Sequence, residues 1–210
     1  MSRFLVAALG ALATTAGDLS MLYVVNAQRP EMGLEAAAPW LLPLSFYLGV
    51  LGVPFYAVGY AALASRLAPE TPRASRVILV AGTIVGVLGA VLHGVIGVSN
   101  EAQLRAGAEF PGPIEDLLVY GEYIVPLAVA VMLAGAVAAS TYVYVVARGK
   151  SSLPRWAAAV NPLSVMVVLV IASSGSTYLE AFLGPASPNL AHLVFFLFLA
   201  RSAGPAKQTR

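Results

Sequence analysis

Five ionisable side chains lie inside apolar stretches of this 210-residue chain: Asp18, His93, Glu122, Glu180 and His192. Such groups are costly at membrane depth unless they are paired, neutral or functional. Removal from water favours the neutral form of a carboxylic acid. Asp18 or Glu180 is therefore expected to act as a general acid, with His93 or a second carboxylate such as Glu122 as the base.

Each of these residues also has a structural interpretation. Glu122 lies near the start of its apolar stretch, where a carboxylate complements the helix dipole, and Glu180 lies four residues before Gly184-Pro185, where it can reach water. His192, close to Asn189, can cap or bridge helices. An internal hydrogen bond between Asp18 and His93 can lock two helices together without any chemistry.

The depth of these groups predicts a cavity among the helix ends in the outer half of the membrane. Aromatic rings there would stabilise positive charge that develops on a bound molecule. A cavity of this kind favours a hydrophobic small molecule that enters from the lipid. The predicted substrate-binding residues are Trp40, Phe46, Tyr47, Tyr56, Tyr120, Tyr123, Asn26, Tyr178, Asn189, His192 and Phe196.

The elements that position these groups are predicted from composition. Hydrophobic residues make up 59% of the chain and charged residues only 10%, against about 25% in soluble domains. Hydrocarbon offers no partner for unpaired backbone groups, and no barrel-like alternation is present, so the spans are helices. We expect an all-α, polytopic transmembrane bundle in a single domain, with six spans at about residues 4–26, 40–65, 76–98, 115–147, 155–183 and 188–200.

Glycines at three- and four-residue spacings support the inward orientation of His93. Gly82, Gly86, Gly89, His93 and Gly97 share one helical face, where neighbouring helices can approach closely. His93 is therefore expected to point into the bundle.

Basic residues orient the predicted spans. Ten of the twelve Lys and Arg residues fall at the two ends of the chain and in the even-numbered loops, and only Arg29 and Arg105 fall in the odd-numbered loops. The positive-inside rule then places both termini in the cytoplasm, and we expect a multi-pass protein of a bacterial-type cytoplasmic membrane. The first 17 residues also have the features of a signal peptide, but the apolar stretch continues past Asp18 through LSMLYVV.

Several classes of chemistry are excluded or disfavoured by the sequence. The absence of cysteine excludes disulfides, thiolate nucleophiles and Cys-bound metal clusters. No nucleotide-binding glycine loop, HExxH or GxSxG motif occurs, and no basic cluster interleaved with aromatic residues points to nucleic acid. The expected partners are a hydrophobic substrate and membrane lipid, with no metal and no cofactor, and assembly into a homo-oligomer is left open.

Two resemblances bear on function. GDLSMLY, GVPFYAVGYAAL, His93-Gly94 and the RW, NP and PNLAHLVFF succession resemble a family of uncharacterised bacterial six-helix membrane proteins, over most of the chain. More remotely, the embedded acids are similar to those of integral-membrane terpene cyclases of meroterpenoid pathways, and this resemblance implies that two carboxylates protonate and deprotonate an isoprenoid. The WE motif of the fungal members is absent, so the assignment to Asp18 and Glu180 rests on depth and chemistry.

Two other functions remain open at this stage. His93 and His192 come from different spans at similar depth, as axial ligation of a b-type haem requires. A proton-coupled transporter or sensor would use Asp18 or Glu180 as its protonation switch. The inner halves of the spans are nearly devoid of ionisable groups, which disfavours a path through the membrane.

Overall fold

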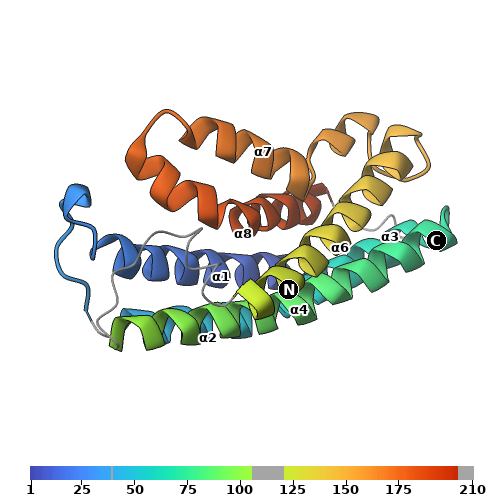
Figure 1. Ribbon diagram of the computed structural model, residues 1–210. Helices are drawn as coiled ribbons and strands as arrows, with labels where there is room; N and C mark the ends of the chain where they lie inside the picture. The colour runs from blue at the N-terminus through green and yellow to red at the C-terminus, as the bar shows by residue number, and fades with distance from the viewer. Residues whose placement is uncertain (39, 106–120, 203–210) are drawn as a thin grey trace.

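The computed structural model describes residues 1–38, 40–105 and 121–202, and within them the chain is all-α with no strand. Its helices are antiparallel and lie side by side (Figure 1). They are α1 (Arg3–Asn26), α2 (Leu41–Gly52), α3 (Phe55–Leu67), α4 (Pro72–Arg105), α6 (Gly121–Ala147), α7 (Pro162–Ser173) and α8 (Thr177–Ser202), with 3-10 turns η1 (Pro30–Met32) and η2 (Arg155–Ala159).

Five helical stretches are long and apolar enough to cross a membrane: α1, α2 with α3, α4, α6 and α8. Many of their outward side chains are large and apolar, including Leu51, Leu133 and Val80. Lipid chains are as apolar as these side chains, so a bilayer covers such a surface without cost. The architecture is that of a multi-pass membrane protein.

The last two predicted spans differ from the observed helices. The predicted span 155–183 contains η2, α7 and the first turns of α8, and a turn at Ser174 and Gly175 separates α7 from α8. α8 therefore begins well before the predicted start at residue 188. α7 has 12 residues, or about 18 Å, against a hydrocarbon core of about 30 Å. It packs antiparallel to α8 (Figure 1).

Pro185 and Pro188 suggested a break, yet α8 continues through both. A proline removes one backbone hydrogen bond, and Pro188 leaves the carbonyl of Gly184 without its usual N–H donor. The Ser187 hydroxyl donates to that carbonyl at 2.6 Å. This local replacement keeps the helix intact and carries Asn189 and His192 on a continuous inner face.

Two further boundaries matter for the site. The second predicted span breaks at Val53 and Pro54 into α2 and α3. α4 continues past the predicted end at residue 98 to Arg105. The polar residues after residue 98 resemble a loop in the sequence but are helical in the structure. The longer α4 adds polar residues at the C-terminal end of this helix.

α1 occupies a central position in the packing. It contacts α2, α3 and α8, while α4 packs against α2, α3 and α6. Small residues on α1 allow close approach, and aromatic rings from α3, α6 and α8 fill the core. These rings are Tyr56, Tyr60, Tyr142, Phe195 and Phe196, all almost fully buried.

Candidate functional site

Asp18, His93 and Asn189 meet where α1, α4 and α8 converge. Asn189 Nδ2 donates to Asp18 Oδ2 at 2.6 Å and lies 3.3 Å from His93 Nε2. His93 Nε2 lies 3.7 Å from Asp18 Oδ1. Asp18 is only 5% exposed, so the side chain of Asn189 provides the hydrogen bond that a buried carboxyl group requires.

Asn189 is fixed by a third contact. The Tyr56 hydroxyl donates to Asn189 Oδ1 at 2.8 Å, which leaves the amide nitrogen directed at Asp18 and His93. One hydrogen of that nitrogen bonds to Asp18, and the other points towards His93 Nε2, which accepts it when the ring is neutral. The orientation of the amide is therefore set by hydrogen bonds from three helices.

His192 is part of the structure that supports this junction. Its Nδ1 donates to the Pro188 carbonyl at 2.8 Å, because a carbonyl oxygen only accepts. In the neutral ring Nε2 then accepts from the Tyr60 hydroxyl at 3.0 Å. The imidazole also stacks on Tyr56, with ring centres 4.6 Å apart and planes 18° apart. His192 thus helps to fix the ring of Tyr56, which in turn donates a hydrogen bond to Asn189.

The position of His93 depends on a glycine of α2. A Cβ atom at Gly49 would lie 2.6 Å from His93 Nδ1 and 2.9 Å from its Cγ. Real Cβ atoms do not approach other heavy atoms this closely, so any larger residue at Gly49 would displace the imidazole. The neighbouring Gly94 has room, since a Cβ there would meet its nearest atom at 3.6 Å.

A cavity of about 220 Å³ adjoins the junction. Half of its lining residues are polar, and the others are aliphatic side chains and a proline. The polar residues are Asp18, His93, Ser99, Asn100, Gln103 and Asn189, and the apolar residues are Met21, Leu22, Val25, Ile96, Ile124 and Pro185. The cavity therefore combines an acid, an imidazole and amides inside an apolar wall.

Three further polar residues that line the cavity, Ser99, Asn100 and Gln103, were not predicted from the sequence, because the predicted third span ended at residue 98. All three are buried on α4. The signal was present as spacing: His93, Ile96, Asn100 and Gln103 continue one helical face at steps of three and four. If the predicted helix had been extended with the same spacing through residues 99–103, these residues would have been identified.

Glu122 and Glu180 do not line this cavity. Both are exposed, in the first turns of α6 and α8 respectively. This is the position in which a carboxylate complements the positive end of a helix dipole. The acid and imidazole that the fold brings together are Asp18 and His93.

The aromatic residues predicted for the wall are distributed differently. Trp40, Tyr47, Tyr123 and Tyr178 are exposed, whereas Tyr56 and Phe196 lie in the core. Phe46 packs towards Gly97 on α4, and Tyr120 lies outside the described residues. Buried Asn26 donates to the Leu22 carbonyl of its own helix. Of the predicted substrate-binding residues, Asn189 lines the cavity. Tyr56 and His192 do not line it but help to fix the side chain of Asn189.

The loop after α1 is held against α8. The Tyr178 hydroxyl donates to the Met32 carbonyl at 2.7 Å, and the Tyr23 hydroxyl donates to the Glu35 carbonyl at 3.2 Å. Within this loop, hydrogen bonds from the Glu31 backbone amide and from Arg29 lower the pKa of the Glu31 carboxyl. Hydrogen bonds from tyrosines of α8 and α1 therefore hold this loop in place.

Axial ligation of a haem by His93 and His192 would cost a hydrogen bond of the His192 ring. Both ring nitrogens of His192 have partners, Pro188 and Tyr60, and iron would have to displace one of them. In the described parts of the chain, no group of three or more His, Asp or Glu residues is arranged to hold a metal ion.

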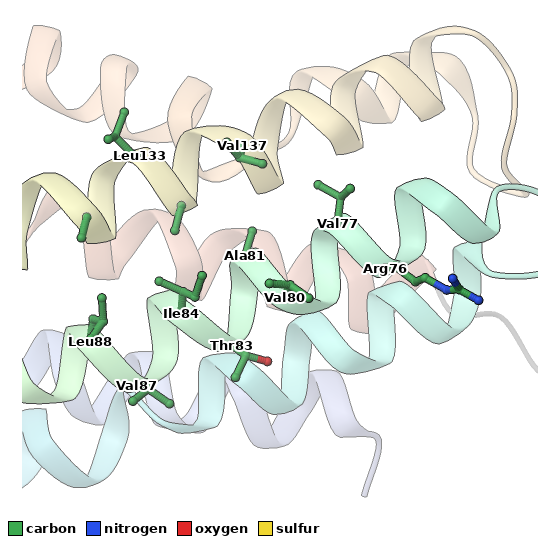
Figure 2. Close-up of a pocket in the computed structure, with 12 residues that line it drawn as sticks. Arg76, Val77, Val80, Ala81, Thr83, Ile84, Val87, Leu88, Leu133 and Val137 are labelled. Atoms are coloured by element: carbon green, nitrogen blue, oxygen red, sulfur yellow. The ribbon is translucent and has the colours of Figure 1, made fainter.

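A wide groove of about 960 Å³ runs along α4 and α6 on the outer surface of the bundle. Figure 2 shows Leu133 and Val137 on α6 and Ala81 and Ile84 on α4, the two helices that form the groove, with Arg76 at one end. The groove has a cation only at that end and is otherwise nearly all aliphatic, so it suits lipid chains. It lies apart from the titratable residues of the cavity.

The chain belongs to a family of unknown function, DUF6796, whose family model matches residues 1–203. No curated protein and no solved structure matches the chain. Functional inference therefore rests on the site itself.

Proposed function

We propose that this protein is a membrane-embedded enzyme that performs acid–base chemistry on an isoprenoid or lipid-like substrate. The observation that carries the proposal is the meeting of Asp18, His93 and Asn189 on the wall of a cavity between four helices. General acid–base catalysis requires a proton donor and a proton acceptor that face the same water-shielded cavity.

Asp18 is the proposed acid and His93 the proposed base. Asn189 binds Asp18 Oδ2, so Oδ1 is the oxygen left to face the substrate and His93. A proton from Asp18 forms a C–H bond on a substrate alkene and leaves a carbocation. Loss of a proton from a carbon of that cation to His93 restores a double bond. The 3.7 Å between His93 Nε2 and Asp18 Oδ1 is longer than a hydrogen bond, so the proton returns from His93 to Asp18 through one intervening water, and no cofactor is consumed.

The size of the cavity restricts the part of the substrate that it holds. A volume of about 220 Å³ is below the range of about 300–1,000 Å³ typical of small-molecule sites. Only the reacting end of a long isoprenoid would enter, and the remaining chain would lie among lipid. Terpene cyclase-like protonation and cyclisation, or double-bond isomerisation, fits this arrangement. Glu180 is not part of the proposed mechanism because it is exposed.

The test is product formation from prenylated or epoxidised acceptors by membranes that contain the protein. Asp18→Asn and His93→Asn should each lower the rate by about 10²–10⁴-fold, the usual contribution of a general acid or base. Glu180→Gln, a matched change in the exposed carboxylate, should retain the rate. Full turnover by Asp18→Asn would refute the assignment.

The orientation of the chain is proposed together with this function. Antiparallel packing of α7 against α8 and the clustering of basic residues support six passes with both termini in the cytoplasm of a bacterial-type cell. Reporter fusions after Ser202 and within the loop at Arg29 should report opposite sides of the membrane. Reporters on the same side would contradict this topology.

A further inference from the structure

Gln103 has a buried amide group without a partner. Its side chain lines the cavity and is only 8% exposed, and Nε2 has no hydrogen-bond partner among the described residues. An unsatisfied buried donor is unfavourable, because it has lost its hydrogen bonds to water without replacing them. Buried amides are nearly always paired, so an unpaired donor that faces a cavity points to a ligand atom that accepts from it.

The surroundings of Gln103 define the chemistry of that atom. Among the described residues that line the cavity, none is Lys or Arg, and Asp18 provides an acidic group. An anionic headgroup would therefore enter without a countercharge, at a high cost of desolvation. A carbonyl, ether or hydroxyl oxygen accepts from an amide without carrying charge.

Gln103 is also separated from the acid–base pair. Gln103 lies ten positions after His93 on α4, which corresponds to about 15 Å between their Cα positions. Both residues line the same cavity, so a single elongated ligand can contact both ends.

We propose that Gln103 is a specificity residue that binds a neutral acceptor oxygen of the substrate, at the opposite end of the cavity from Asp18 and His93. The inference rests on the proposed function, because it assumes that the cavity takes a substrate. It adds the class of substrate, which is an uncharged isoprenoid that carries an oxygen atom far from the carbon that Asp18 protonates.

Binding of a matched pair of probes tests this directly. One probe is geranyl methyl ether, and the other is the hydrocarbon in which a CH₂ group replaces the ether oxygen. Both are titrated into the full-length protein in phosphatidylcholine nanodiscs. The ether should bind about 5- to 10-fold more tightly, the value of one hydrogen bond to a buried donor. Geranyl phosphate should bind more weakly than the ether.

Gln103→Leu should abolish the preference for the ether. This variant removes an unsatisfied polar group and keeps a similar volume, so it is expected to fold at least as well as the wild type. Gln28→Leu is the matched control, because Gln28 is exposed and outside the cavity, and it should keep the preference. Equal binding of both probes to the wild type, or an unchanged preference in Gln103→Leu, would overturn the proposal.

A spectroscopic measurement locates the contact independently of affinity. The chain has three glutamines, so selective ¹⁵N labelling gives few side-chain amide signals. The ether, but not the hydrocarbon, should shift the Gln103 amide proton downfield and leave Gln28 unchanged. No shift at Gln103 would contradict the contact. Because neither readout uses turnover, loss of the preference for the ether and loss of acid–base activity are separate results.

Discussion

Replacement of Asn189 by leucine should destabilise the bundle through the loss of two interhelical hydrogen bonds. Asn189 donates to Asp18 at 2.6 Å and accepts from Tyr56 at 2.8 Å, and leucine has similar size but neither group. Interhelical hydrogen bonds in membranes average about 0.6 kcal/mol, with a maximum near 1.7. The bond to Asp18 is short and involves an acid, so we expect about 1–2 kcal/mol from it and about 0.6 kcal/mol from Tyr56.

A double-mutant cycle isolates the Asp18–Asn189 pair. The free energy of unfolding is measured by titration of mixed micelles with sodium dodecyl sulfate, for wild type, Asp18→Leu, Asn189→Leu and the double variant. The coupling energy should be about 1–2 kcal/mol. Asn26→Leu is the control, because Asn26 is a buried asparagine whose side chain bonds to Leu22 of its own helix and to Arg29 of the following loop, and not to another helix. Its effect should add to that of Asp18→Leu, and a coupling below about 0.3 kcal/mol for Asn189 would refute the reasoning.

Two further predictions concern positions that hold the site in place. Gly49→Ala should displace His93 and lower activity, because its Cβ would lie 2.6 Å from His93 Nδ1, whereas Gly94→Ala should have little effect; equal activity of the two variants would contradict the packing. Ser187→Ala should lower the free energy of unfolding by about 1 kcal/mol in the same micelle titration, because the Gly184 carbonyl loses its donor, and an unchanged value would show that Pro188 needs no such replacement.

Asp18 and His93 show what sequence reasoning can achieve for this site. The helical period of small residues around His93 predicted an inward direction, and the depth of Asp18 predicted a shielded carboxyl group. Both side chains line one cavity in the structure. Helical spacing and depth in the membrane predict the directions of these side chains because a charge that faces lipid is costly, which leaves few allowed directions for such residues.

The remaining parts of the site depend on helix boundaries, which the sequence defines less well. Ser99, Asn100 and Gln103 form a polar run that is typical of a loop, and only the buried face of α4 makes a longer helix favourable. Pro185 and Pro188 indicated an end to a helix, but a side-chain hydroxyl replaced one missing donor. Glu180 became exposed because α8 begins at Thr177, so its carboxylate falls in the first helical turn.

The central claim is that Asp18 transfers a proton to a carbon atom of the substrate. Because this proton returns to Asp18 through water, it exchanges with solvent between turnovers. The most direct measurement is deuterium incorporation from D₂O into non-exchangeable positions of prenylated lipids, followed by mass spectrometry. Wild-type protein and Glu180→Gln should incorporate carbon-bound deuterium at similar rates, and Asp18→Asn should be slower by about 100-fold or more. Incorporation by Asp18→Asn at the wild-type rate would contradict the account.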